Sequence, residues 1–266
     1  MLKFRSLNIV IAFVIVALVI LQLFGFEYAW IFLIVLILIY SVVVTLGVVK
    51  VKWQFFMPVI CKVPNKQKVV FLSFDDGPGE KTRAILDLLK DYKATGNFFC
   101  VGKRLEENPE LAKLLVDEGH FIGNHTYSHS NKFPLQSKKE MVAEIENTNS
   151  LIKKITGTAN RYFRPPYGVS NPNIATAIRK LNMICIGWSI RSFDTMDNVG
   201  NKALNKITSN LKSGDIILLH DTSPQIIFIL EQLLIFLLEN GFTTQRIDKY
   251  LEDKINLDAN LLENNE

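Results

Sequence analysis

The chain contains 266 residues, 48% of them hydrophobic, and carries a formal net charge of +4. This length is sufficient for one sizeable domain with an appendage. Basic and acidic residues are mixed along the chain, and the lack of a basic block argues against a nucleic-acid-binding protein. The three cysteines form no CxxC pair, which argues against a disulfide framework or a zinc ribbon. We expect Cys100 and Cys185, which lie in apolar runs, to be buried free thiols.

The excess of apolar residues lies near the start of the chain. Residues 9–24 include one polar side chain, Gln22, and residues 30–49 are almost wholly apolar. Each run approaches the ~20 residues that an α-helix needs to cross a bilayer. A cleaved signal peptide is disfavoured, because no small-residue cleavage site follows the first run and a second run comes directly after it. We therefore expect residues 1–52 to be a membrane anchor of two transmembrane helices, with one long signal anchor as the alternative.

The charges beside these two runs indicate an orientation in a bacterial inner membrane. Two basic residues precede the first run and two follow the second: Lys3, Arg5, Lys50 and Lys52. The turn between the runs carries only Glu27. The positive-inside rule then places both ends of the anchor, and the domain that follows, in the cytoplasm. If the two runs instead insert as one anchor, the domain lies outside the membrane.

From residue 68 onward, short apolar runs alternate with amphipathic stretches. Seven runs are predicted strands: Val69–Phe74, Gly96–Val101, Phe121–Asn124, Arg161–Phe163, Met183–Trp188, Asp215–Leu219 and Phe242–Thr244. The predicted helices are 80–91, 109–118, 138–154, 173–180, 200–211, 225–239 and 246–252. Strands that are each followed by a helix predict a parallel α/β fold. We expect a linker at residues 53–67, one domain at 68–252, and a disordered tail at 253–266, which is rich in asparagine and acidic residues.

The polar residues that can carry chemistry follow the predicted strands. Each comes at or soon after the point where a strand ends: Asp75, Asp76, His125, His129, Arg164, Asp194 and His220. In parallel α/β folds the active site lies at the carboxyl ends of the strands. We therefore predict that these side chains share one site. His120 is not accompanied by other residues of this kind, and we expect it to be structural.

A metal site is predicted from two histidines and one carboxylate. His125 and His129 are four residues apart, so on one turn of helix both imidazoles would face the same side. With Asp76 they supply three ligands and leave positions open for water and substrate, as catalytic zinc sites do. The segment lacks the glutamate of HExxH, which disfavours a zincin protease. The same ligand types also describe non-haem iron oxygenases, but those enzymes usually have an all-β fold that this alternation does not suggest.

The remaining polar residues suggest a base and an acid. Adjacent carboxylates at a strand end repel one another unless something compensates. A metal ion on Asp76 and the cation of Arg164 beside Asp75 would do so, and Asp75 could then act as general base. A histidine has a suitable pKa for the general acid that must protonate a departing amine. We assign that role to His220, with Asp194 orienting its ring.

Four motifs resemble, in order, those of the NodB-homology polysaccharide deacetylases, carbohydrate esterase family four. They are Phe74-Asp75-Asp76-Gly77-Pro78, His125-Thr126-Tyr127-Ser128-His129, Arg164-Pro165-Pro166-Tyr167 and Leu218-Leu219-His220. The resemblance extends over roughly residues 68–250. It implies a deformed (β/α)7 barrel, here preceded by two transmembrane helices. It also implies a divalent metal ion, usually Zn2+ and sometimes Co2+ or Ni2+, and hydrolysis of N-acetyl groups on GlcNAc-type sugars.

The resemblance implies the same base, acid and metal ligands as the reasoning above, and it adds three substrate contacts. Tyr167 would lend its backbone N–H to the oxyanion, and Trp188 and Leu218 would wall the acetyl pocket. One motif departs from the family. In the DxxDW-like stretch, Arg191 stands where the first aspartate would be and Thr195 where the tryptophan would be. A cation beside the cleft leads us to expect tolerance of an acidic or phosphorylated substrate.

The function that we predict is metal-dependent deacetylation of a glycan that contains N-acetylated amino sugars, with release of acetate. Peptidoglycan, a chitin-like polymer and a lipid-linked precursor are the candidate substrates, and the bilayer is the other expected partner. One alternative is an amidase or deformylase of the same fold that acts on a lipid-linked sugar or a non-sugar amide. A second alternative is a non-catalytic membrane-bound glycan-binding module, although binding requires neither a base nor an acid.

Overall fold

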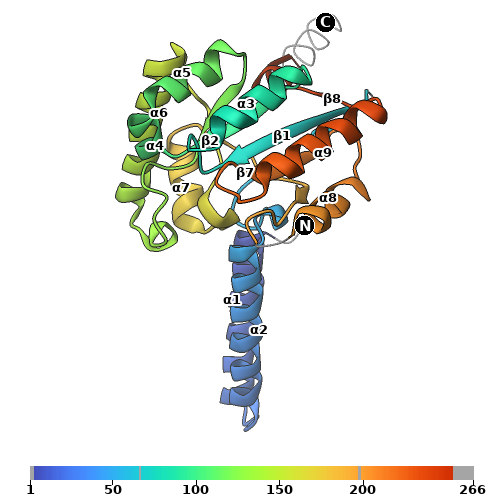
Figure 1. Cartoon of the computed structure of the whole chain (residues 1–266). Helices are drawn as coiled ribbons and strands as arrows, with labels where there is room; N and C mark the ends of the chain where they lie inside the picture. Colours follow the sequence, from blue (N-terminus) through green and yellow to red (C-terminus); the bar gives the residue numbers. More distant parts are fainter. Residues whose placement is uncertain (1–2, 66, 197–198, 254–266) are drawn as a thin grey trace, which may run out of the picture.

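A hairpin of two apolar helices projects from an α/β domain in the computed structural model, which describes residues 3–65, 67–196 and 199–253 (Figure 1). Helix α1 covers Phe4–Leu23 and α2 covers Ala29–Val49. Both are long enough and apolar enough to cross a membrane, by length and composition. A 3.0 Å hydrogen bond from the Tyr40 hydroxyl to the Asn8 side chain joins the two helices. The two apolar runs of the sequence are therefore helical.

The strands form a parallel sheet that curls into a half-barrel. Its order is β5-β4-β3-β2-β1-β7-β6, and all neighbours in that order are parallel. The strands are β1 (Val69–Asp75), β2 (Gly96–Cys100), β3 (Phe121–Asn124), β4 (Tyr162–Phe163), β5 (Ile184–Cys185), β6 (Ile190–Arg191) and β7 (Ile216–His220). A short β8 (Thr243–Thr244) pairs with the start of β1. The expected deformed (β/α)7 fold is confirmed.

Helices follow most of the strands and cover the outside of the sheet. They are α3 (Thr82–Asp91), α4 (Gly102–Glu107), α5 (Pro109–Asp117), α6 (Lys138–Thr156), α7 (Pro172–Lys180), α8 (Gly200–Thr208) and α9 (Ile226–Glu239). Three 3-10 turns connect them: η1 (Val51–Trp53), η2 (Phe133–Leu135) and η3 (Pro166–Gly168). The sequence did not predict α4 or β6. They have six and two residues, too few to show a hydrophobic period.

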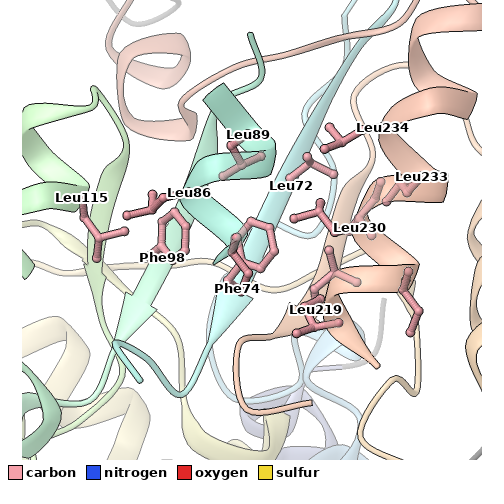
Figure 2. Close-up of a cluster of buried hydrophobic side chains, with 14 of the residues drawn as sticks. Leu72, Phe74, Leu86, Leu89, Phe98, Leu115, Leu219, Leu230, Leu233 and Leu234 are labelled. Atoms are coloured by element: carbon pink, nitrogen blue, oxygen red, sulfur yellow. The ribbon is translucent and has the colours of Figure 1, made fainter. Parts of the chain in front are cut away.

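A cluster of apolar side chains holds α3 and α9 against β1 and β7 (Figure 2). Phe74 of β1 stacks on Phe98 of β2, with ring centroids 4.8 Å apart. Leu230 and Leu233 project from α9 into the same cluster, and all four side chains are almost fully buried. Burial of each such side chain stabilises the fold by roughly 1.5–3 kcal/mol. The cluster therefore fixes β1 and β7, the strands that end at Asp75 and His220.

The segment between the hairpin and β1 is integrated into the barrel. We call residues 55–63 the strap, because alternate side chains along it are buried: Met57, Val59, Cys61 and Val63. Ile60 pairs in parallel with Ile186 beyond β5, and Lys62 pairs antiparallel with Asp215 before β7. The Lys62 ammonium also lies 2.8 Å from the Asp215 carboxylate. The strap thus connects the β5 edge to the start of β7.

Residues that we expected to be structural are buried away from the polar site. Cys100 and Cys185 are buried free thiols, as is Cys61. His120 is buried and its Nδ1 accepts a 3.2 Å hydrogen bond from the Gly96 N–H. Burial, with the nearby Arg246 charge, lowers the pKa of His120 to about 4. The domain boundaries after residues 52, 67 and 252 stay predictions, and from residue 254 the predicted tail lies outside the described residues.

Candidate active site

Five of the seven polar residues predicted to share a site line one pocket at the carboxyl ends of the strands, and the other two, Arg164 and Asp194, are fully buried. The pocket has a volume of about 230 Å³. It is lined by Asp75, Asp76, His125, His129, Tyr167, Gly168, Trp188, Arg191, Thr195, Leu218 and His220. Hollows of about 790 and 900 Å³ lie elsewhere, and no histidine or aspartate lines either one. A hollow of about 310 Å³ adjoins the pocket and shares Asp76 and His129 with it. The small pocket is therefore the candidate active site, because five of the reactive groups converge there.

Asp75 is the last residue of β1 and is held by a buried arginine. Arg164 follows β4, is 0% exposed, and places a guanidinium nitrogen 2.6 Å from Asp75 Oδ1. The same nitrogen donates to the Ser73 hydroxyl at 2.9 Å, and the other guanidinium nitrogens donate to carbonyls beyond β5. A buried arginine is stable only when its donors are matched in this way. The arrangement fixes the Asp75 carboxylate and compensates its charge.

Asp76, His125 and His129 form a compact group of metal-ligand types. Their ligand atoms all lie within 4.8 Å of one another. The Nε2 atoms of His125 and His129 lie 3.6 and 3.2 Å from Asp76 Oδ1. Burial raises the pKa of Asp76, but the two imidazoles outweigh it and hold that pKa below its usual range. Burial and the His125 charge lower the pKa of His129, which favours the neutral, metal-binding form.

The expected helical turn at His125–His129 is wrong. These residues form a loop after β3, in which Thr126 and His129 have positive φ values of 66° and 49°. The imidazoles still meet, with ring centroids 4.9 Å apart. A carboxylate on α6 holds the loop: Glu144 accepts hydrogen bonds from the N–H groups of Tyr127 and Ser128 at 2.9 and 2.8 Å. Bonds from the helix therefore replace the helical spacing that we assumed.

The histidine tautomer suits a metal ion. His125 Nδ1 lies 2.8 Å from the carbonyl oxygen of Arg164. A carbonyl can only accept, so Nδ1 carries a proton, and Nε2 is the ring nitrogen that faces Asp76. A backbone carbonyl that orients a histidine in this way is the usual outer support of a metal ligand. The residues present therefore fit a divalent cation, and their nitrogen and oxygen donors suit Zn2+.

His220 forms a hydrogen-bonded pair with Asp194. Its Nδ1 lies 2.9 Å from Asp194 Oδ1, and its backbone N–H donates to Asp194 Oδ2 at 2.8 Å. Burial alone would lower the pKa of His220, but the bond to Asp194 and the charges of Asp75 and Asp76 outweigh it and raise that pKa. Asp75 and His220 are register partners on adjacent parallel strands. Two titratable groups that line one small pocket from neighbouring strands suit acid and base roles.

The expected substrate contacts also reach the pocket. Tyr167 has a positive φ of 61°, which turns the chain sharply within η3. Gly168 follows, and a Cβ there would lie 2.3 Å from the Trp188 ring, so only glycine permits this approach. Leu218, which lies on β7, also lines the pocket. The Arg191 guanidinium lies 5.0 Å from the Phe193 ring centroid and 5.9 Å from that of Trp188, which places a cation at the mouth of the pocket.

Sequence reasoning missed two acidic residues that support the site. Glu144 lies on α6, where an acidic residue on a helix gives no distinctive signal. Asp221 is buried beneath the loop after β1 and accepts a 2.6 Å hydrogen bond from the Thr82 hydroxyl. Burial, despite that bond, raises the pKa of Asp221 to about 6. Its position next to His220, at the end of an apolar strand, was a usable signal.

Comparison with known proteins identifies relatives over most of the domain. Residues 62–186 match the family model described as "Polysaccharide deacetylase". A peptidoglycan-N-acetylglucosamine deacetylase of Bacillus cereus is 37% identical over 167 residues, which cover 60% of this chain and 76% of that protein. The peptidoglycan-N-acetylmuramic acid deacetylase PdaA of Bacillus subtilis is 32% identical over 195 residues, covering 71% and 74%.

Solved structures agree with this assignment. The peptidoglycan deacetylase PdaC from Bacillus subtilis superposes with a TM-score of 0.67 at 30% identity, covering 76% of this chain and 99% of that chain. A CE4 family pseudoenzyme from Bacillus anthracis has a TM-score of 0.66 at 26% identity, covering 72% and 68%. The curled parallel sheet, the two well-covered relatives and the matching motifs lead to one conclusion. The chain belongs to the polysaccharide deacetylase family of carbohydrate hydrolases.

Proposed function

We propose that the chain removes N-acetyl groups from the amino sugars of a glycan by hydrolysis and releases acetate. The observation that carries the proposal is the convergence, in one pocket, of a fixed carboxylate, a histidine of raised pKa and a set of metal ligands. The named activities of the relatives, which are deacetylases of peptidoglycan and of chitooligosaccharide, support the same reaction. Acetylated glucosamine or muramic acid residues are the proposed substrates.

Asp76, His125 and His129 would hold the divalent ion, which we propose to be Zn2+. Co2+ and Ni2+ suit the same nitrogen and oxygen donors. When bound, the ion supplies Lewis-acid chemistry, which polarises an acetyl carbonyl and lowers the pKa of water. The chain's part is to aim both imidazoles at one point, through the Arg164 carbonyl on one ring and the loop bonds to Glu144.

Asp75 is the proposed general base and Arg164 its positioning residue. The carboxylate takes a proton from the water that attacks the acetyl carbon. Arg164 contacts only Asp75 Oδ1 among that side chain's oxygens, at 2.6 Å, and Oδ2 is directed toward the histidines, 3.8 Å from His125. One oxygen is therefore held while the other is free to accept a proton. The backbone N–H of Tyr167 is the proposed donor to the oxyanion that forms.

His220 is the proposed general acid. An amide nitrogen leaves only after it gains a proton, and the Nε2–H of a charged imidazole can supply that proton. Asp194 binds Nδ1 and so holds the ring in position with Nε2 directed away from it. Trp188 and Leu218 are proposed to enclose the acetyl methyl group, since both line the pocket beside Asp75. The small volume of about 230 Å³ suits a short acyl group.

The Bacillus anthracis pseudoenzyme demonstrates that this fold also occurs without activity. A glycan-binding module requires neither a base nor an acid, so the fixed Asp75 and the paired His220 favour catalysis here. A deformylase would use the same machinery on a smaller acyl group. Substrates that carry N-formyl groups therefore belong in the test.

The test measures acetate and formate released from N-acetylated and N-formylated glycans by the purified full-length protein in detergent. We expect acetate release that EDTA abolishes and Zn2+ or Co2+ restores. Asp75→Asn should bind the metal ion but lose roughly 10²–10⁴-fold in kcat, the usual effect of removing a general base. Turnover in a metal-free preparation, or a near-wild-type kcat for Asp75→Asn, would refute the mechanism. Formate release alone would favour the deformylase.

The helical hairpin is proposed to be a membrane anchor. Its two helices have 20 and 21 residues, and mean hydropathies of 2.7 and 3.0. At 1.5 Å per residue each would extend about 30 Å, the thickness of the hydrocarbon core. Both ends of the hairpin meet the domain, since the Phe4 N–H donates to the Phe55 carbonyl of the strap at 3.0 Å. An anchor of this form would hold the N-terminus and the domain on the same side.

A further inference from the structure

The base of the hairpin is hydrogen-bonded to the segment that follows the wall of the pocket. The N–H of Ser170 donates to the Val48 carbonyl of α2 at 2.9 Å, and its hydroxyl lies 3.4 Å from the Gly47 carbonyl. Ser170 comes two residues after Gly168 and three after Tyr167, which both line the pocket. The carboxyl ends of the strands, where the site opens, therefore lie at the end of the domain from which the hairpin leaves.

Exposed apolar side chains gather at the same end. Outside the hairpin, the large apolar side chains that are exposed among the described residues are Trp53, Leu135, Tyr167, Phe193, Met196, Phe228 and Leu238. We call Leu135, Phe193 and Met196 the rim; they are 88%, 38% and 57% exposed. Phe193 and Met196 flank Thr195 of the pocket wall. Only Phe228 and Leu238, both on α9, belong to neither the hairpin base nor the loops around the pocket.

The loop that carries Leu135 is joined to the hairpin base. Its neighbour Phe133 is buried in a cluster with Val51 and Met57, which connect the hairpin to the strap. The Pro134 carbonyl accepts a 2.7 Å hydrogen bond from the Asn171 side chain, next to Ser170. In Figure 1, α7, α8 and the loop before α6 lie at the hairpin end of the domain, whereas β8 and the C-terminal end of α9 lie far from it.

The chemistry of this end suits a lipid surface. Lys50 lies over the Trp53 ring, 4.9 Å from its centroid, at the point where α2 ends, and this pairing of tryptophan and lysine is typical of the membrane–water interface. Lys206 lies 3.8 Å from the centroid of the Phe193 ring, so the rim combines apolar groups with cations. Cations attract anionic headgroups while apolar side chains enter the boundary of the acyl chains.

We propose that the rim rests in the headgroup region of the bilayer that the hairpin crosses, so that the pocket opens at the membrane surface. The substrate is then an N-acetylated sugar that is attached, through a phosphate or diphosphate, to a lipid of the same bilayer. This inference rests on the proposed deacetylase activity for the reaction, but not for the placement of the rim. It follows from the contacts at Ser170 and from the rim itself, and it holds on either side of the membrane.

The placement of the rim is tested without any measurement of activity. Leu135→Cys, Met196→Cys and the control Leu238→Cys, which is on α9 and 71% exposed, are labelled with a fluorescent dye in the full-length protein. The native cysteines are buried and should stay unlabelled. In vesicles of phosphatidylethanolamine and phosphatidylglycerol, headgroup-labelled nitroxide lipid should quench the dyes at 135 and 196 but not the dye at 238. Equal quenching at all three positions would overturn the proposal.

The substrate class is tested with the double variant Leu135→Asp/Met196→Asp and the control Leu238→Asp. Each is assayed in vesicles on a polyprenyl-diphosphate-linked N-acetylglucosamine and on a soluble N-acetylated oligosaccharide. Loss of two interfacial side chains should lower turnover of the lipid-linked sugar by at least about tenfold, with the soluble rate unchanged. Equal loss on both substrates, or none, would overturn the lipid-linked assignment. Absence of wild-type turnover on both would reject the deacetylase, and the quenching result would still stand.

Discussion

At the scale of single residues, His220 has its protonation set by three carboxylates. Burial disfavours its charged form, but the 2.9 Å bond to Asp194 and the charges of Asp75 and Asp76 favour it more strongly, so its pKa is raised. A general acid must be protonated, so activity should fall as pH rises through that pKa. A raised pKa therefore moves the alkaline limit of activity upward and extends the active range.

This gives a pH prediction for Asp194→Asn. The substitution removes the contact that raises the pKa of His220, so the alkaline limb of the kcat/KM profile should move to lower pH. The measurement is kcat/KM against pH for wild type, Asp194→Asn and the exposed control Asp87→Asn on α3, all loaded with the same metal ion. An alkaline limb that stays in place in Asp194→Asn would show that His220 is not the acid.

Arg191 supports a prediction about specificity. Its guanidinium is exposed at the mouth of the pocket and has no ion-pair partner among the described residues. Arg191→Asp should lower kcat/KM about 10- to 100-fold for sugars with a carboxylate or phosphate beside the N-acetyl group, relative to neutral sugars, since a charged hydrogen bond contributes about 1.5–3 kcal/mol. Arg179→Asp, exposed on α7, is the control. An unchanged ratio of the two substrates would assign Arg191 no role.

At the scale of elements, α6 supports the loop from His125 to His129 from outside the sheet. Its N-terminus has a capping box formed by Ser137 and Glu140. Glu144, one turn further on, accepts bonds from the loop that joins His125 to His129. The helix therefore positions the two histidines that are proposed to hold a metal ion.

We predict that Glu144→Ala weakens metal binding by about 10–100-fold, the usual effect of losing an outer support of a ligand. Glu146→Ala, exposed on the same helix, should leave it unchanged. Competition of the purified proteins with a chromophoric chelator for Zn2+ gives both affinities, and circular dichroism checks the fold. Equal affinities for the two variants would contradict a supporting role for Glu144.

The elements also show which features a sequence can reveal. Residues such as Asp75 and His220 were predictable, because parallel strands bring all their carboxyl ends to one edge. The loop at His125–His129 was not, because its positive φ values depend on bonds from a helix far along the chain. The strap escaped notice for a related reason. Its alternation covers only a few residues, and its partners lie more than a hundred residues away.

At the scale of the whole molecule, the side of the membrane on which the domain lies is open to a direct test. The hairpin brings both of its ends to the domain. Two basic residues flank each end, and the turn holds Glu27. The positive-inside rule therefore favours the cytoplasmic face. In that case the substrate would be a nucleotide- or lipid-linked precursor, because mature wall polymer lies beyond reach.

A reporter protein that fluoresces only in the cytoplasm should fluoresce when it is fused after Glu266. Alkaline phosphatase fused at the same position should stay inactive. A fusion placed in the turn after Gly25 is the matched control and should behave in the opposite way. Phosphatase activity at the C-terminus without fluorescence would reject the cytoplasmic orientation and place the domain outside. Peptidoglycan, the substrate named for several relatives, would then be within reach.

The strap would limit how far the domain could work from a membrane that the hairpin crosses. A free linker would let a tethered domain explore a volume that grows with linker length. Here the connecting chain is part of the barrel, because Ile60 pairs with Ile186 and Lys62 pairs with Asp215. The pocket of an anchored molecule therefore travels in a plane at constant height. Its encounters with membrane-bound sugars would depend on their surface density and on lateral diffusion, and sugars fixed in a polymer above that plane would go unprocessed.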